Sequence, residues 1–114
     1  MMGTTARIVV YATDLKKGEI AIKAAFDRAD EIGFICSDYN PESELMRLCR
    51  GPVNEPIPVS RTLATVLTHA HSIAEPTEGA FDPTLGGFTE LWRRSKRKNA
   101  LPDPSLLEKA RNAA

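Results

Sequence analysis

The chain has 114 residues and a mass of 12.5 kDa, which is the size of one small domain. Its hydrophobic fraction of 42% and charged fraction of 26% are ordinary for a globular protein and argue against disorder throughout. The overall net charge is zero, but residues 1–92 carry −5 and residues 93–114 carry +5. This asymmetry indicates an anion-binding edge or a solvated helix end.

Two cysteines, Cys36 and Cys49, are too few for a disulfide framework, and we expect both to be reduced and packed. No apolar stretch reaches the roughly 18–20 residues of a membrane span. The N-terminal residues MMGTTARIVVYA lack the charged and apolar regions of an export signal. The sequence as written therefore predicts a cytoplasmic chain with no membrane span.

The N-terminal part predicts a strand followed by a long helix. Residues 4–12 are rich in β-branched side chains, which is typical of a strand. Asp14 can cap a helix from residue 15 to about residue 32, where apolar residues recur at helical spacing and Gly33 suits the end. Residues 34–39 predict a brief strand or extended turn.

Two more helices are expected in the middle of the chain. Asn40-Pro41 predicts a cap and first helical residue for a short helix over residues 42–50. Residues 51–58 contain three prolines and a glycine and predict a loop. Ser60 can cap a helix from residue 61 to about residue 75, whose apolar residues follow a 3.6-residue period.

The C-terminal part predicts a loop over GAFDPTLGG and a short amphipathic segment from Phe88 to Trp92. The basic run RRSKRK follows, and Asp103-Pro104 begins a last short helix. This order of elements predicts an α+β fold with an incomplete sheet. A single strand leaves backbone groups unpaired, so its partners must come from more chain or from another copy.

The segment from Glu78 to Trp92 is the most informative for function. Ala80 and the preceding glycine let a flat ligand approach the backbone, and Phe81 can stack on an aromatic ring. Asp82 precedes a proline, and its carboxylate can accept hydrogen bonds from a ribose or a base. The alternative is a plain turn between helices, in which Asp82 only bonds to the nearby backbone.

Two other segments carry weaker signals. Tyr39 could stack on the flat ring of a ligand or lie at the edge of the core, while Ser43 and Glu44 suit the first turn of a helix. Met2 stands at the start of the predicted strand, next to a glycine that permits close backbone approach.

Three separated motifs resemble those of the ApbE-type flavin transferases: MGT, SDYNPESEL and GAFDPTLGGFTELW. The last of these, running from glycine-alanine-phenylalanine to tryptophan, is specific to that family. The resemblance covers essentially the whole chain but only the N-terminal portion of the family. It implies that residues 1–114 are the N-terminal portion of a flavin transferase domain whose C-terminal portion is absent.

The resemblance implies an enzyme, an FAD:protein FMN transferase. A threonine or serine hydroxyl of an acceptor protein attacks the pyrophosphate of FAD with Mg²⁺, FMN becomes covalently attached, and AMP leaves. Motif positions imply that the substrate FAD is contacted by Met2, Tyr39, Ala80, Phe81 and Asp82. Family members are often periplasmic or membrane-anchored lipoproteins.

Two departures from the family pattern are visible. Cys49 stands where the family usually has asparagine, and the metal-binding aspartate and threonine of the family fall beyond residue 114. We therefore expect no catalytic residue and no Mg²⁺ ligand in this chain, and a truncated or split form that is inactive alone. Such a truncated chain would act together with a missing C-terminal half or would self-associate. The alternative is a small non-catalytic binding module whose basic tail binds a protein or nucleic acid.

Two remaining patterns have plainer explanations. Cys36, Cys49, His69 and His71 do not have the spacing of zinc ligands, because His-x-His on a helix directs its rings differently. The basic run over residues 93–98 lacks interleaved aromatic residues. We favour a solvated helix end over nucleic-acid binding, with contact to pyrophosphate or an acidic acceptor as a third possibility.

Overall fold

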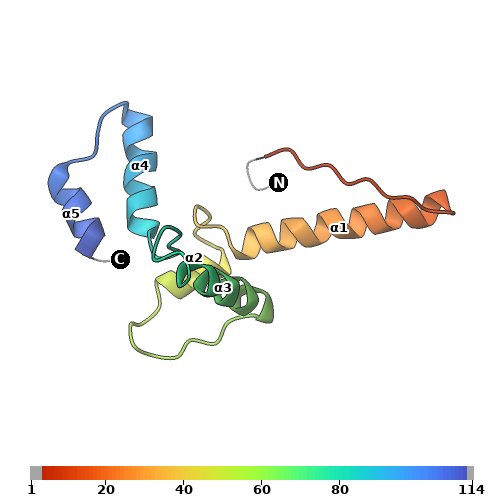
Figure 1. The fold of residues 1–114 in the computed structure, drawn as a ribbon, viewed down its shortest axis with the longest axis horizontal. Coiled ribbons are helices and arrows are strands. Elements are labelled where there is room, and N and C mark those ends of the chain that lie inside the picture. Colours follow the sequence, from red (N-terminus) through yellow and green to blue (C-terminus); the bar gives the residue numbers. More distant parts are fainter. Residues whose placement is uncertain (1–3, 113–114) are drawn as a thin grey trace. The chain divides into compact units, whose positions relative to one another are not determined.

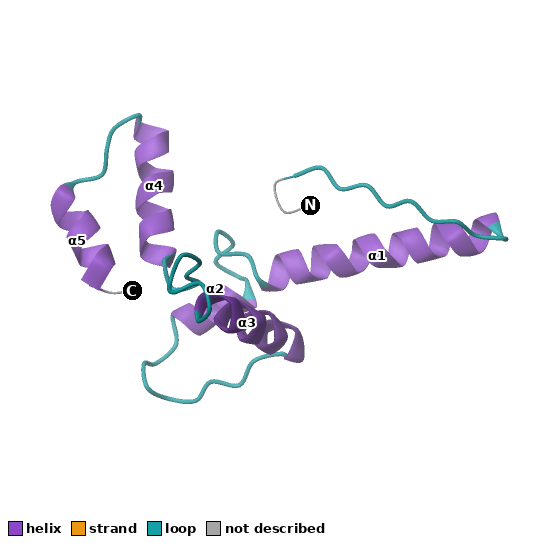
Figure 2. Cartoon of the chain, viewed as in Figure 1, coloured by secondary structure: helices purple, strands orange, loops and turns teal. Residues whose placement is uncertain are grey.

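A computed structural model describes residues 4–112, which form five α-helices joined by loops (Figures 1 and 2). The helices are α1 (Leu15–Ile35), α2 (Glu44–Cys49), α3 (Arg61–Ala74), α4 (Gly86–Lys98) and α5 (Pro104–Asn112). The chain divides into two compact units, one ending at Thr65 and the other beginning at Val66. Each unit is considered by itself below.

The predicted α+β class is wrong for the described residues, because none of them forms a strand. Residues 5–12 instead run without regular structure into α1, and most of their apolar side chains are exposed, with Val9 61% and Tyr11 98% accessible. β-Branched composition favours an extended backbone, but a strand also needs a neighbour for its N–H and C=O groups. No other described segment provides that neighbour.

Helix α1 begins where predicted and ends later. The carboxylate of Asp14 accepts a hydrogen bond from the Lys17 backbone N–H at 3.2 Å and caps the first turn. The predicted end at Gly33 is wrong, since the helix continues through Phe34 to Ile35. Of the brief strand or extended turn predicted over residues 34–39, the strand is wrong, and residues 36–39 form a turn after the helix. A glycine inside a helix costs only about 1 kcal/mol, which the surrounding turns can offset.

Helix α2, unlike α1, starts later than predicted. Asn40 does not cap it; its side-chain oxygen accepts the Glu42 N–H at 3.0 Å in a separate turn. The cap is Ser43, whose Oγ accepts the Met46 N–H at 3.0 Å. Helices α1 and α2 contact each other in the first unit.

The predicted helix from residue 61 is confirmed as α3. Ser60 Oγ accepts the Leu63 N–H at 3.2 Å, which is the expected capping hydrogen bond. The helix ends at Ala74, one residue before the predicted boundary.

In the second unit, α4 and α5 contact each other and run in roughly opposite directions (Figure 1). Gly87 of α4 lies against α5, because a Cβ there would stand 3.7 Å from Ala110 Cβ. The predicted amphipathic segment ending at Trp92 proves too short, since α4 includes the basic run and ends at Lys98. Lysine and arginine are good helix formers and suit the C-terminal end of the helix dipole.

The apolar core is very small. Among residues 4–112, Leu63 is the one hydrophobic side chain that is fully buried. Large apolar side chains such as Ile20, Phe34 and Ile73 remain about half exposed or more. No helix in the described part of the chain is both long and apolar enough to cross a lipid bilayer.

Candidate functional site

The GAFDP segment forms a tight turn just after α3. The backbone takes a positive φ at two successive residues, Glu78 (50°) and Gly79 (81°). Glycine adopts such an angle without strain. The Thr77 hydroxyl donates to the Ile73 carbonyl at 2.8 Å and accepts the Phe81 N–H at 3.3 Å. Thr77 therefore fixes the reversal that presents Ala80 and Phe81, and the sequence analysis did not identify it.

The carboxylate of Asp82 is held by the residue two positions later. Its Oδ1 accepts hydrogen bonds from both the backbone N–H and the hydroxyl of Thr84, each at 2.7 Å. These bonds lower the pKa of the Asp82 carboxyl below its usual value, with the hydroxyl contributing most. Asp82 thus forms the local turn that the sequence analysis gave as the alternative to ligand binding. Its negative charge is kept in a fixed position close to Phe81.

The SDYNPES segment is built around two buried serines. Ser43 Oγ donates to the Ser37 carbonyl at 2.6 Å, and Ser37 Oγ accepts the Asn40 N–H at 3.1 Å. Ser43 is fully buried and Ser37 is 7% exposed. The two hydroxyls close a loop in which Tyr39 is 72% exposed. A stacking partner could approach its ring from solvent.

Glu44 does more than complement the dipole of α2. Its carboxylate accepts the backbone N–H of Ser60 at 2.5 Å, so it joins the start of α2 to the start of α3. This hydrogen bond is the main cause of a lowered pKa for the Glu44 carboxyl. Desolvation, helped by the Glu44 charge, raises the pKa of the Cys36 thiol, which disfavours its reactive thiolate.

Three of the five predicted FAD contacts are neighbours in the sequence, so their proximity does not depend on the fold. Ala80, Phe81 and Asp82 are consecutive in one turn of the second unit. Tyr39 belongs to the first unit. Met2 lies outside the described residues.

The described residues do not fit a metal ion. Within residues 4–112, no group of three or more His, Cys, Asp or Glu side chains could coordinate one. Cys36 is half-buried and Cys49 is exposed, and both are free thiols. No chemical step is therefore assigned to a metal held by these residues.

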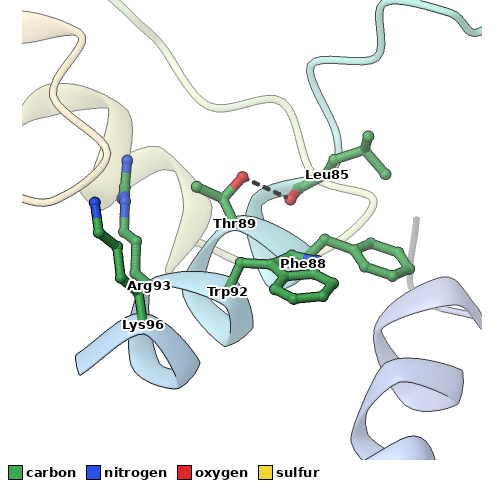
Figure 3. Close-up of a pocket in the computed structure, with 6 residues that line it drawn as sticks. All are labelled: Leu85, Phe88, Thr89, Trp92, Arg93 and Lys96. Atoms are coloured by element: carbon green, nitrogen blue, oxygen red, sulfur yellow. Dashed lines mark hydrogen bonds between the residues drawn. The ribbon is translucent and has the colours of Figure 1, made fainter. Parts of the chain in front are cut away.

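Helix α4, which follows the GAFDP turn, carries an open hollow of about 620 Å³. Figure 3 shows the rings of Phe88 and Trp92 next to each other, with Arg93 and Lys96 farther along the same hollow. Thr89 Oγ1 donates to the Leu85 carbonyl at 3.1 Å, at the first turn of α4. The sequence analysis noted the amphipathic segment but did not predict this hollow.

Comparison with known proteins gives one consistent result. The sequence profile of the ApbE family matches residues 2–114. A protein named FAD:protein FMN transferase from Chlamydia pneumoniae is 31% identical over 103 residues, covering 90% of this chain and 33% of that protein. Proteins of the same name from Treponema pallidum (strain Nichols) and Chlamydia muridarum (strain MoPn / Nigg) are 30% and 34% identical, over 96% and 81% of this chain.

These relatives are much longer than the matched region. The match covers 31% of the Treponema pallidum protein and 28% of the Chlamydia muridarum protein, so this chain spans about a third of the curated relatives it matches. The profile match extends across the GAFDP turn, the SDYNPES loop and α4 alike. The chain belongs to the ApbE family.

Proposed function

We propose that this chain supplies one wall of the FAD site of an FAD:protein FMN transferase. The observation that carries the proposal is the GAFDP turn, in which a fixed carboxylate and an exposed aromatic ring lie on adjacent residues. Phe81 is 44% exposed and can stack on a ring of the dinucleotide. Asp82, with Oδ1 bonded to Thr84, can accept a ribose or base donor through Oδ2.

The proposed reaction transfers FMN from FAD to an acceptor protein. A threonine or serine hydroxyl of the acceptor forms a bond to the FMN-side phosphorus and loses its proton, and the bond to AMP breaks. Residues Ala80, Phe81 and Asp82 would bind and orient the nucleotide, with Tyr39 and Met2 as further proposed contacts. Orientation alone can contribute several kcal/mol to such a displacement.

We assign Mg²⁺ binding to the part of the family fold that this chain does not span. The described residues lack a metal-binding group, and the relatives have about twice as much additional chain. By this proposal, the third of the fold represented here does not transfer FMN by itself. It requires the remaining two thirds, supplied as a separate or a joined polypeptide.

The test is reconstitution with the corresponding two thirds of the Treponema pallidum relative. The two pieces are co-expressed with an acceptor protein, FAD and Mg²⁺, and covalent flavin is read by fluorescence in a denaturing gel. We expect flavin transfer from the pair and none from this chain alone. A covalent flavin band from this chain alone would overturn the requirement for the rest of the fold.

The site assignment is tested by Asp82→Ala, with Asp103→Ala as the matched control. Both aspartates precede a proline and accept the N–H two residues later, at 2.7 Å for Asp82 and 2.8 Å for Asp103. We expect Asp82→Ala to weaken FAD binding by the reconstituted pair about ten- to a hundred-fold, as for a lost charge-assisted hydrogen bond. Asp103→Ala should leave it unchanged. Equal FAD affinity of Asp82→Ala and wild type would remove Asp82 from the site.

A further inference from the structure

Two hollows adjoin along one flank of α4. The larger is the hollow of about 620 Å³ described above, and the second, of about 320 Å³, continues past the end of the helix to Leu101. Trp92 and Lys96 line both hollows, so they form one continuous surface from Leu85 to Leu101. This surface, which we name the Trp92 strip, lies entirely within the second unit.

The Trp92 strip is strongly apolar for an exposed surface. Trp92 is 51% exposed, Leu101 is 86% exposed and Leu85 is 37% exposed. No residue of α5 lines either hollow, and α5 approaches α4 at Gly87, opposite Ala110. Contiguous apolar patches of this kind mark binding surfaces in soluble proteins.

Positive charge follows the apolar residues along the same helix. Lys96, Arg97 and Lys98 form the last turn of α4. Arg94 forms an ion pair with Glu90 at 2.7 Å, so we do not include it in this cationic group. The surface therefore fits a partner that presents apolar side chains with carboxylates at one end.

The shape of the surface fits a protein better than a small molecule. Ligand sites enclose most of the surface of the molecule they bind, whereas the Trp92 strip is a long, open flank. Tryptophan in such a position is a common anchor of protein interfaces. The relatives have about twice as much further chain, which is a polypeptide of sufficient size to cover it.

We propose that the Trp92 strip is the docking surface for the polypeptide that carries the remaining two thirds of the family fold. That polypeptide inserts apolar side chains against Trp92 and sets acidic side chains against the last turn of α4. Because α4 directly follows the GAFDP turn, this contact also fixes the turn beside the rest of the site. The inference rests on the proposed function.

Trp92 is the one tryptophan of the chain, so it reports on this surface alone. The chain is labelled with 5-fluorotryptophan, and its single ¹⁹F resonance is followed as the unlabelled two-thirds fragment of the Treponema pallidum relative is added. We expect a shifted resonance that loses its solvent isotope shift, because the ring becomes buried. If the fragment is insoluble alone, the two pieces are joined in one polypeptide, and Trp92→Phe identifies the resonance.

Variants test whether association depends on the Trp92 strip rather than on another part of the chain. Trp92→Ala and Lys96→Glu should each weaken association at least tenfold, while helix content by circular dichroism stays unchanged. The control is Val53→Ala, an apolar truncation at a residue that is 84% exposed in the other unit. It should associate like wild type.

Three results would overturn the proposal. One is an unchanged Trp92 resonance, in the complex or in the joined polypeptide. Another is equal association by Trp92→Ala and wild type. The third is a resonance that shifts with the chain's own concentration or with added RNA, which would identify a second copy or a nucleic acid as the occupant. Burial of Trp92 without flavin transfer would instead support this docking surface and contradict the proposed function.

Discussion

Ser43 is the residue on which the SDYNPES loop depends. Its hydroxyl donates to the Ser37 carbonyl and accepts the Met46 N–H, and no part of the side chain reaches solvent. In the sequence, Ser43 resembles any polar residue in a first helical turn. Its burial could not be predicted, because it results from the chain folding back over Ser37.

Replacement of Ser43 by alanine should therefore destabilise the chain. The change removes the cap of α2 and leaves a buried carbonyl without its donor, which together cost about 2 kcal/mol. Urea unfolding followed by circular dichroism measures this loss. Ser72→Ala is the matched control, because the exposed Ser72 hydroxyl bonds only to the His69 carbonyl of its own helix. Equal stability of the two variants would contradict the role of Ser43.

At the scale of elements, the sequence predicts helices better where a single cap stands before a clear apolar period. Helix α3 meets both conditions, with Ser60 before Leu63, and its prediction is confirmed. Before α2, the Asn40-Pro41 pair predicted the cap and Ser43 was expected inside the first turn, whereas Ser43 is the cap in the structure. The choice between them depends on burial, which local spacing does not reveal.

The sequence predicted the GAFDP turn better than it predicted the structure of residues 4–12. Residues 4–12 have strand composition, but pairing depends on a neighbour that lies outside the segment itself. The GAFDP turn was predicted as a loop with a ligand-accepting carboxylate as one alternative, and the structure shows the turn. The roles of Thr77 and Thr84 in that turn were missed, because a threonine near a helix end has no distinctive pattern.

The end of α4 provides a prediction at this scale. Asn99 takes a left-handed conformation, with φ 48° and ψ 42°, and the Ala100 N–H donates to the Ser95 carbonyl at 3.2 Å. This is the pattern of a Schellman motif, in which glycine is the preferred residue. We expect Asn99→Gly to be neutral or slightly stabilising and Asn99→Ala to cost about 1 kcal/mol. Thermal unfolding of both variants checks the order, and a more stable alanine variant would contradict it.

The whole molecule has little buried apolar surface for its length. In residues 4–112, Leu63 is the fully buried hydrophobic side chain, while Val10, Val66 and Leu106 are about 40% exposed. Burial of apolar side chains is the main favourable contribution to folding, and the entropy lost on ordering the chain opposes it. This imbalance fits a chain that folds fully only together with further polypeptide.

We therefore expect the chain alone to be marginally stable or to self-associate. Its free energy of unfolding should lie below the roughly 5 kcal/mol at the lower end for natural domains. Sedimentation at several concentrations and thermal melting provide the measurement, with the reconstituted pair as the comparison. A sharp melt of a monomer, independent of concentration, would show instead that the chain is an independently stable domain.

The hydrogen bond between Glu44 and Ser60 has a consequence for the evolution of the chain. It ties the start of α2 to the start of α3 and so closes the stretch that contains the proline-rich loop over residues 50–59, whose tip carries the exposed Val53 and the positive-φ Asn54. The entropy of closing a loop rises only slowly with its length once its ends are fixed. Insertions and deletions can therefore accumulate at this tip while the first turns of α2 and α3 keep their places.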